Sequence, residues 1–417
     1  MEIIRTKYLD WLDKEKDRHF IKILTGIRRS GKSTTLIQFI NQLKTVYKVK
    51  SNRIIYYDFN DAKLRKKYNW ESLLDEIESK ADTKSTNYLF LDEIQDIPNF
   101  EDVVITLFEH KTLKFDIYLT GSNSYMFSKN MVTFFTGRTV ELNVLPLSFN
   151  EIYTIFKSAN QSDEYIDRFY AEAFLQKYIL QGGLGILVDS YNDLESNKNY
   201  LRGIVKDTIA KDIENRHNLK KDTTVLEKLI IYAFEHVGRD INSKRIENYF
   251  LSNEKAVITN KTIINYLTWL TDSQIMHKIK YFDVRGLKTL SSNSMYYAGD
   301  LGLLSSVIGF DINRLKGYRL ENLVFLELLF RGYEVETGFD KNKNSVDFIA
   351  KKENERIYIQ VTDQLNEENE IREYKTLLLA KNATRKIILT NAVNVPRKDN
   401  GVVIVFLIDW LLGKVNF

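Results

Sequence analysis

Short apolar runs alternate with longer stretches of helical periodicity through the first 150 residues of the chain. The runs FIKILTG, RIIYYDFN, YLFLDEI, DIYLTGS and VELNVLP have the length of buried strands. Helical patterns such as KSTTLIQFINQL, WESLLDEIES and EDVVITLFEH lie between them. Strands separated by about 10–15 residues of helix predict βαβ units and a parallel sheet. We therefore expect residues 1–150 to form an α/β domain.

Three further parts are predicted from the same patterns in the remainder of the chain. Residues 151–222 look helical and contain a glycine break, QGGLG, so we interpret them as a helical lid or linker. Residues 223–300 contain three helical segments followed by a strand, which is the order of a winged helix-turn-helix. Residues 301–417 return to mixed helices and strands and predict a separate, smaller α/β domain.

Composition narrows the classes of protein that the chain can belong to. Its 417 residues are 44% hydrophobic and 28% charged, which is ordinary for a soluble globular protein of several domains. The net charge of +4 permits an acidic or nucleic-acid partner without requiring one. The absence of cysteine excludes disulfides, thiolate metal sites and cysteine nucleophiles. None of the five histidines forms a His-x-x-x-His pair, which argues against a histidine metal site.

Neither end of the chain predicts membrane association. The first twenty residues are charged throughout and do not resemble a signal peptide. The longest apolar run, GVVIVFLIDWLLG, is interrupted by Asp409 and is too short to cross a bilayer. We therefore expect a cytoplasmic protein without membrane contact.

The stretch GIRRSGKST follows the first predicted strand and fits the phosphate-binding pattern Gly-x-x-x-x-Gly-Lys-Ser. Its glycines allow backbone torsions that turn the loop amides inward, and the next helix adds its positive end. Lys32 is expected to reach the β- and γ-phosphates, and Ser33 to ligate Mg²⁺. The predicted nucleotide-binding residues are Gly26, Ile27, Arg28, Arg29, Ser30, Gly31, Lys32, Ser33 and Thr34. The alternative is a tight strand–helix turn that binds no ligand.

A second element of such a site is the acidic pair that ends YLFLDE. The apolar residues form a buried strand, so the pair emerges at its carboxyl end, where open α/β sheets bind ligands. Asp92 is predicted to hold Mg²⁺, and Glu93 to act as the general base on the attacking water. The alternative is that these carboxylates only cap the start of a helix.

Further polar residues could complete the catalytic group. The fourth strand ends in LTGSNS, where Asn123 or Ser122, and less strongly Thr120, could contact the γ-phosphate or the attacking water. Arg138, in TGRTVE, could stabilise phosphate charge at the nucleotide of a neighbouring subunit. Polar caps of a turn, and a surface or salt-bridged arginine, are the corresponding structural interpretations.

Together these blocks resemble a predicted-ATPase family of bacteria and archaea that joins an AAA+ type ATPase domain, AAA_14, to a C-terminal domain, DUF4143. The matching blocks are GIRRSGKST, YYDFND, YLFLDEIQ, LTGSNSYMFS, GRTVELNVLPLSFNEIY, RLENLVFLELLFRGYEV, SVDFIA and YIQVT. The resemblance implies binding of ATP with Mg²⁺ and hydrolysis of ATP. A guanine-reading motif is missing from the sequence, which agrees with ATP. The family tends to carry proline after the two glycines of QGGLG, so the departure here concerns local loop shape.

The last domain resembles the restriction-endonuclease fold, whose nucleases need an acid on one strand and Glu-x-Lys on the next. Asp347 occupies the position of the first acid, and Glu321 on the preceding helix could assist it. Gln360 and Thr362 stand where Glu and Lys belong, and Lys375 could replace the lysine only by pointing back into the site. We therefore expect a binding or regulatory module, with an active nuclease disfavoured.

The predicted winged helix could contact DNA. In NKTIINYLTWLTDSQ, the side chains of Ile263, Ile264, Leu267 and Leu270 are expected to form a buried face, which would leave Lys261, Thr262, Asn265 and Thr268 for phosphates or bases. Other basic residues of this part are Lys244, Arg245, Lys278, Lys280, Arg285 and Lys288. A basic module is what DNA binding requires, but winged helices also contact proteins.

Three functions are therefore open from the sequence. The first is a Mg²⁺-dependent ATPase that couples hydrolysis to a partner, with DNA favoured. The second is a nucleotide-gated scaffold with little turnover, whose partner is another protein or a second copy of the chain. The third is an ATP-dependent nuclease, which Gln360 and Thr362 disfavour.

Overall fold

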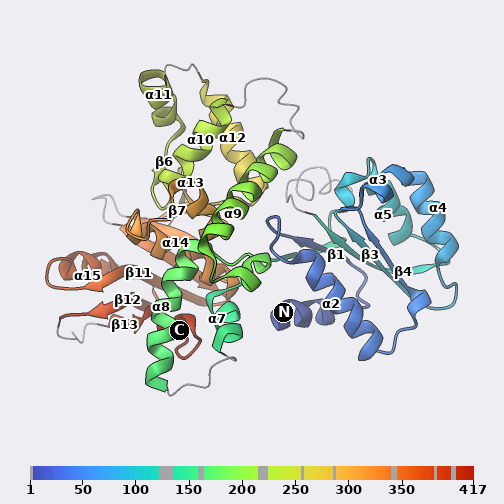
Figure 1. The fold of residues 1–417 in the computed structure, drawn as a ribbon, viewed down its shortest axis with the longest axis horizontal. Helices are drawn as coiled ribbons and strands as arrows, with labels where there is room; N and C mark the ends of the chain where they lie inside the picture. Colours follow the sequence, from blue (N-terminus) through green and yellow to red (C-terminus); the bar gives the residue numbers. More distant parts are fainter. Residues whose placement is uncertain are drawn as a thin grey trace. The chain divides into compact units, whose positions relative to one another are not determined.

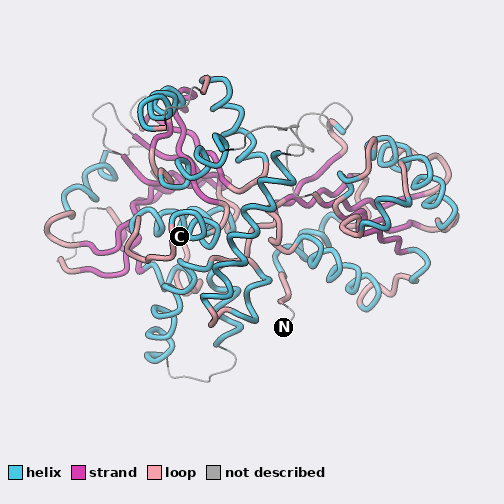
Figure 2. The backbone as a smooth tube through the Cα atoms, turned by 45° about the horizontal axis from the view of Figure 1, so that its top comes forward, coloured by secondary structure: helices cyan, strands magenta, loops and turns pink. Residues whose placement is uncertain are grey.

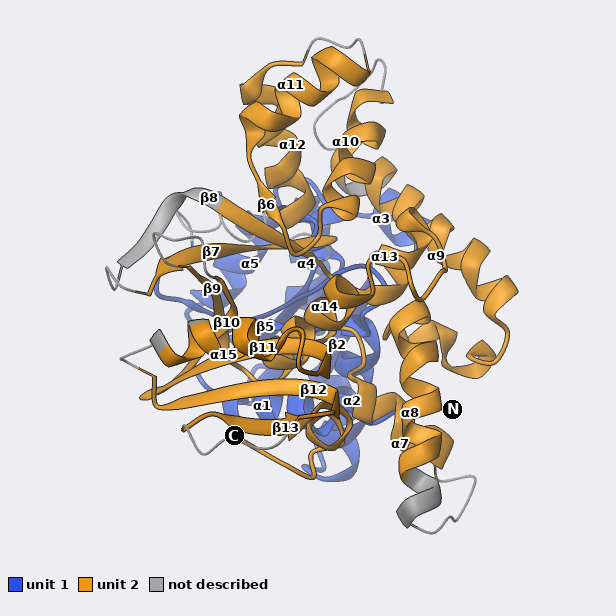
Figure 3. Cartoon of the chain, turned by 90° about the vertical axis from the view of Figure 1, so that its left-hand side faces the viewer, with its two compact units in different colours: residues 1–145, 272–274 blue, residues 146–271, 275–417 orange. Residues whose placement is uncertain are grey.

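The computed structural model describes residues 3–121, 135–157, 164–214, 224–254, 258–284, 288–339, 345–379, 383–395 and 401–417. The chain forms two compact units (Figures 1 and 3). Unit 1 comprises Met1–Leu145 with Asp272–Gln274, and unit 2 comprises Pro146–Thr271 with Ile275–Phe417. The boundaries predicted within residues 151–417 stay predictions.

Unit 1 is built around a sheet of parallel strands. These strands are β1 (Ile21–Thr25), β2 (Ile54–Asp58), β3 (Thr86–Asp92), β4 (Lys114–Thr120) and β5 (Thr139–Asn143). Their order is β2-β3-β4-β1-β5, so β4 separates the strand before the phosphate loop from the strand that carries the acidic pair. The parallel α/β sheet expected from the alternating pattern is confirmed.

Helices cover both faces of this sheet, as the tube in Figure 2 shows. They are α1 (Thr6–Glu15), α2 (Lys32–Thr45), α3 (Ala62–Lys67), α4 (Trp70–Lys80) and α5 (Phe100–Phe108), with short 3-10 turns at Ser51–Arg53 and Ile94–Asp96. Successive strand side chains point to opposite faces. Phe90 therefore packs in the core that contains α1 and α2, whereas Leu89 and Leu91 pack in the core that contains α4 and α5.

Unit 2 combines many helices with a sheet of eight strands. Its helices are α7 (Phe149–Lys157), α8 (Glu164–Gln181), α9 (Leu194–Thr208), α10 (Thr224–Glu235), α11 (Ser243–Asn253), α12 (Asn260–Asp272), α13 (Leu301–Ile308), α14 (Lys316–Phe330), α15 (Glu370–Leu379) and α16 (Leu407–Leu411), with a 3-10 turn at Gly185–Ser190 and a π-helical turn at Ile209–Glu214. The strands are β6 (Asp240–Ile241), β7 (Met276–Asp283), β8 (Lys288–Ala298), β9 (Glu334–Phe339), β10 (Ser345–Lys352), β11 (Glu355–Leu365), β12 (Arg385–Val393) and β13 (Val403–Phe406). Their order in the sheet is β13-β12-β11-β10-β9-β7-β8-β6.

The segment predicted as a winged helix contains α10, β6, α11, α12, β7 and β8 in that order. Strand β8 pairs antiparallel with both β6 and β7. Strand β7 also pairs parallel with β9, so the hairpin continues into the sheet of the C-terminal region. The winged-helix class itself stays a prediction.

The buried face expected for α12 is confirmed except at one position. Ile263, Leu267 and Leu270 are buried, whereas Ile264 is 50% exposed. The first three stand at i, i+4 and i+7, which share one face of a helix, but a residue one position further on is rotated by about 100°. The inclusion of Ile264 in the core was therefore wrong.

The glycine pair of QGGLG makes room for a buried carboxylate. Gly182 has φ of +72°, and a Cβ on it would lie 2.2 Å from Oδ1 of Asp300. Asp300 caps α13 and accepts hydrogen bonds from the backbone N–H groups of Gly183 (2.7 Å), Gly302 (2.8 Å) and Leu303 (3.1 Å). Burial raises the pKa of the Asp300 carboxyl to about 6.

Among the described residues, no helix has both the length and the apolar character that a membrane span requires.

Candidate functional site

The phosphate loop lies between β1 and α2 and forms a cradle that only glycine permits. Gly26 has φ of +149°, and a Cβ on it would stand 2.3 Å from the carbonyl oxygen of Val144. Gly31, with φ of +102°, begins the helix in a torsion that favours glycine. The buried Oγ of Ser30 has no hydrogen-bond partner in the described part of the chain. A cradle with an unmatched hydroxyl fits an anionic ligand that supplies acceptor oxygens.

Lys32 is held inside this loop. Its side chain is 4% exposed, and its Nζ donates to the carbonyl oxygens of Gly26 (3.0 Å) and Ile27 (3.2 Å). The same Nζ lies 3.7 Å from Oε1 of Glu93. Phosphate oxygens, which are charged, are stronger acceptors than these carbonyls, so a triphosphate can replace them as partners of the ammonium group.

Ser33 and Asp92, the predicted magnesium ligands, lie next to each other. Asp92 ends β3, is fully buried, and accepts hydrogen bonds from the hydroxyls of Ser33, Thr120 and Tyr56, the last at 3.2 Å. Burial is the largest effect on this carboxyl and raises its pKa. A hydroxyl beside a carboxylate suits Mg²⁺, which is held by few protein oxygens and keeps several waters.

Glu93 stands directly after the strand in a left-handed conformation, with φ of 53° and ψ of 42°. Its backbone N–H donates to Oγ1 of Thr120 at 2.9 Å, and its carboxylate accepts a hydrogen bond from Nε2 of Gln95. The carboxylate is therefore directed to Lys32 and Gln95. Thr120, with one hydroxyl, fixes both members of the acidic pair.

Arg138 does not lie near the phosphate loop of its own chain. It comes just before β5, whose first residue pairs with Ile21 at the start of β1, whereas the phosphate loop follows the end of β1. Because the strands are parallel, the arginine lies at the opposite edge of the sheet. Its guanidinium pairs with Glu109 at 2.7 Å. A role at the nucleotide of a second subunit stays a prediction.

The other predicted residues fall into two groups. Ile27 is buried, and Arg29 and Thr34 are exposed. The positive charge of Arg28 favours the ionised form of the Asp96 carboxyl. Asn123 and Ser122 lie outside the described residues.

Two polar neighbours of the site were missed from the sequence. Tyr56 reaches Asp92 from β2, and Gln95 reaches Glu93 from the turn that follows it. The pattern YYDF, in a strand next to the acidic strand, was a usable signal for the tyrosine.

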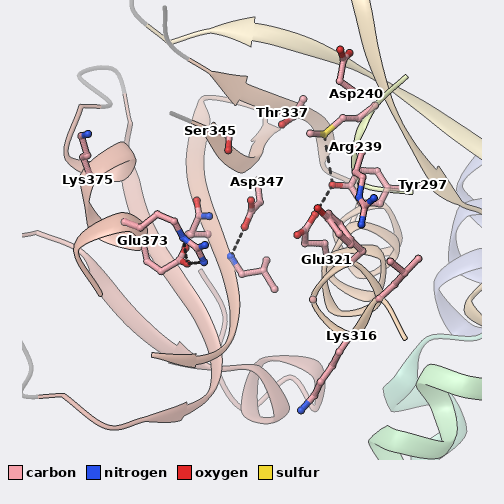
Figure 4. Close-up of a pocket in the computed structure, with 18 of the residues that line it drawn as sticks. Arg239, Asp240, Tyr297, Lys316, Glu321, Thr337, Ser345, Asp347, Glu373 and Lys375 are labelled. Atoms are coloured by element: carbon pink, nitrogen blue, oxygen red, sulfur yellow. Dashed lines mark hydrogen bonds and ion pairs between the residues drawn. The ribbon is translucent and has the colours of Figure 1, made fainter. Parts of the chain in front are cut away.

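Unit 2 contains a separate cavity of about 1150 Å³ (Figure 4). Four residues considered for the nuclease-like site line it: Glu321 of α14, Asp347 of β10, Gln360 of β11 and Lys375 of α15. Glu373 of α15 also lines it and was not anticipated. Burial raises the pKa of Asp347 to about 7 and raises that of Glu321 well above its ordinary range.

Hydrogen bonds hold these carboxylates in place. Asp347 Oδ2 accepts from the backbone N–H of Val361 at 2.8 Å, and Glu321 Oε2 accepts from the Tyr297 hydroxyl at 3.2 Å. In the described ranges, no group of three or more His, Cys, Asp or Glu residues could hold a metal ion.

Among the described residues, the candidate Lys375 does not direct its ammonium group to Asp347. Figure 4 shows the Lys375 ammonium group pointing away from Asp347. The Thr362 hydroxyl donates to the backbone of Gln364 at 3.0 Å and accepts from Asn369 at 3.2 Å. The expectation of a module that binds rather than cleaves stays a prediction.

Comparison with known proteins identifies the class of unit 1. The family model described as an AAA domain, AAA_14, matches residues 18–153, which contain the phosphate loop and the acidic pair. Among solved structures, the chain is similar to the Walker-type ATPase PABY2304 of Pyrococcus abyssi, with a TM-score of 0.50, 16% identity, and coverage of 73% of this chain and 95% of that one. The fold and site define a P-loop ATPase domain of the AAA type.

Two curated relatives extend the likeness along the chain. An uncharacterized protein of Haemophilus influenzae is 33% identical over 417 residues, with 98% of each chain covered. The uncharacterized protein MJ1544 of Methanocaldococcus jannaschii is 33% identical over 413 residues, which cover 94% of this chain and 88% of the relative. The chain belongs to the same family as these proteins. A model for a domain of unknown function, DUF8612, matches residues 172–314, whereas the DUF4143 domain implied by the resemblance is not shown.

Proposed function

We propose that the protein is a Mg²⁺-dependent ATPase that hydrolyses ATP to ADP and phosphate. The observation that carries this proposal is the arrangement of Ser33, Asp92 and Thr120 beside Lys32. Ser33 and Asp92 would hold Mg²⁺, which would neutralise charge on the transferring phosphate. Lys32 would bind the phosphates through its ammonium group.

Glu93 would accept a proton from the attacking water. Its carboxylate first has to leave its contacts with Lys32 and Gln95. ATP would favour this change, because the phosphates compete with Glu93 for the Lys32 ammonium group.

Steady-state phosphate release from ATP and Mg²⁺ tests the proposal. Glu93→Gln should abolish release while ATP binding persists, because the amide keeps the size of the side chain but cannot accept the proton. Asp75→Asn, which makes the same kind of change on the exposed face of α4, should behave as the parent protein. Full turnover by Glu93→Gln would refute the role assigned to Glu93.

We infer further that the partner coupled to hydrolysis is DNA, bound through α11, α12 and the β7–β8 hairpin. Lys244, Arg245, Lys261, Lys278 and Lys280 are all exposed on these elements. When lysine and arginine side chains neutralise DNA phosphates, the counterions condensed on the DNA are released, so binding should weaken steeply as salt rises. Duplex DNA should accelerate phosphate release, and Lys244→Ala with Lys261→Ala should remove that acceleration without changing the basal rate.

One observation favours a second candidate, a nucleotide-gated scaffold with little turnover. Glu93 is held by Lys32 and Gln95, so its carboxylate is engaged with the protein. Tight ATP binding with negligible phosphate release, with and without DNA, would favour this candidate over the ATPase.

A further inference from the structure

The residue that precedes α1 is a buried arginine directed to the phosphate loop. Arg5 is 4% exposed. Its Nη1 donates to the carbonyl oxygen of Ser30, inside the loop, at 3.2 Å, and to that of Leu145, where the first segment of unit 1 ends, at 2.6 Å. Burying an ionised group is costly unless hydrogen bonds replace its water. The guanidinium therefore joins two backbone segments that lie far from it in the sequence.

The surrounding elements of unit 1 hold this arginine in place. Its guanidinium carbon lies 4.4 Å from the centroid of the Tyr8 ring, and the Tyr8 hydroxyl accepts a hydrogen bond from the Leu145 N–H at 3.0 Å. The segment before it is attached to α2, because Nε2 of Gln38 donates to the carbonyl oxygen of Ile3 at 2.7 Å. Arg5 is thus placed by contacts with α1 and α2, and it can serve as a fixed point for the loop.

The contact with Ser30 sets the direction of the next amide in the loop. A peptide bond is planar and trans, so the carbonyl of Ser30 and the N–H of Gly31 point in opposite directions. Because Arg5 binds the carbonyl, the Gly31 N–H points away from Arg5. Gly31 has φ of +102°, and glycine adopts many backbone conformations, so contacts rather than torsional preference must fix this peptide. Loop amides are the donors of a phosphate cradle.

We propose that Arg5 is a positioning residue of the nucleotide site, which holds the Ser30–Gly31 peptide so that the Gly31 N–H donates to phosphate. The inference rests on the proposed function, because it requires a nucleotide in the loop. Arg5 acts through the backbone, since its Nη1 is directed to the two carbonyl oxygens.

Calorimetric titration of the full-length chain with ADP and Mg²⁺ gives the first test. Arg5→Ala should weaken ADP binding at least about tenfold, because one hydrogen bond to a charged phosphate is no longer held in place. Arg5→Lys keeps a charge that can reach a carbonyl but lacks the planar fork of the guanidinium, so its affinity should lie between those of Arg5→Ala and the parent.

Hydrogen–deuterium exchange at single-residue resolution gives a second test that a general loss of stability would not mimic. In the parent, saturating ADP should slow exchange of the Gly31 amide. In Arg5→Ala, saturating ADP should no longer slow it, whereas the amide of Ser33 should still be protected. The difference between the two amides reports the direction of one peptide, because both lie in the same nucleotide site.

Arg53→Ala is the matched control. Arg53 also binds a backbone carbonyl of unit 1, that of Thr86, through Nε at 2.9 Å and Nη2 at 2.7 Å. Thr86 begins β3, whereas the acidic pair follows at the other end of that strand. Both alanine variants should have a lower melting temperature than the parent, so titrations are done below the lowest transition. Arg53→Ala should bind ADP and protect Gly31 as the parent does.

Three outcomes would overturn the inference and leave the ATPase proposal intact. They are equal ADP affinity in the parent and Arg5→Ala, an equal loss of affinity in Arg53→Ala, and unchanged protection of Gly31 by ADP in Arg5→Ala. If Arg5→Ala did not fold, parent-like affinity and protection in Arg5→Lys would overturn it. A parent that bound neither ADP nor ATP would overturn the proposed function, and the inference with it.

Discussion

Thr120 offers a sharp test of how the acidic pair is held. Its hydroxyl donates to Asp92 and accepts from the backbone N–H of Glu93 at 2.9 Å, and the residue is fully buried. Thr120→Val keeps the shape but leaves a buried N–H without an acceptor and removes one donor from a buried carboxylate. At about 1–2 kcal/mol for each loss, the local free energy of opening should fall by roughly 2–4 kcal/mol.

Hydrogen–deuterium exchange measures this change at the ends of β3 and β4. Because about 1.4 kcal/mol corresponds to a factor of ten, the amide of Glu93 should exchange roughly 30-fold to several hundred-fold faster in the variant. ATPase activity should fall as well, since the acidic pair is no longer held in one position.

Thr120→Ser is the matched control, because it keeps the hydroxyl and loses only a methyl group. It should retain most of the protection and activity. If Thr120→Val exchanged as slowly as Thr120→Ser, the hydroxyl would not hold the acidic pair, and the reasoning would be refuted.

Three other predictions concern the nucleotide loop and the buried cap of α13. Gly26→Ala should weaken ATP binding at least about tenfold, as its Cβ would stand 2.3 Å from the Val144 carbonyl oxygen, and calorimetric titration measures the loss. Lys32→Ala should weaken binding of a fluorescent ATP analogue by a similar or larger factor, because a charge-assisted contact is lost. The Asp300 carboxyl has its pKa raised to about 6, so its contribution to stability is fully present below pH 4 and is lost as pH rises through 6. Denaturant unfolding of the parent and of Asp300→Asn measures this contribution. The difference between their free energies of unfolding should fall by about 3 kcal/mol as the pH rises from 4 to 7.5. A difference that does not vary over this range would contradict the prediction.

The nucleotide site could be read from the sequence because local backbone geometry determines much of it. The phosphate loop joins a strand to a helix within a few residues, so Lys32 and Ser33 are placed by the same turn. Asp92 meets Ser33 because the carboxyl ends of parallel strands share one edge of a sheet. The strand order β2-β3-β4-β1-β5 was not predicted, because the sequence pattern indicates a parallel sheet without fixing which strands are neighbours.

Residues placed by tertiary packing were harder to predict. Glu373 reaches the cavity only through the way that α15 packs beside β10 and β11, and sequence spacing does not encode that contact. The same holds for Gln95, whose contact depends on the left-handed turn at Glu93. Arg138 could have been assigned to the far edge of the sheet from its position before a parallel strand.

The pairing of β7 with β9 makes the sheet continuous between residues that the sequence assigned to two different parts. Asp347 lies on β10, which pairs with β9, and β9 pairs with β7. Two strand pairings therefore connect the cavity to the β7–β8 hairpin. If a ligand in the cavity shifts the position of that hairpin, the affinity for that ligand and the affinity for a partner bound by the hairpin are linked, and linkage is reciprocal. A cavity ligand that tightened binding of such a partner by some factor would itself be bound more tightly, by the same factor, when the partner is present.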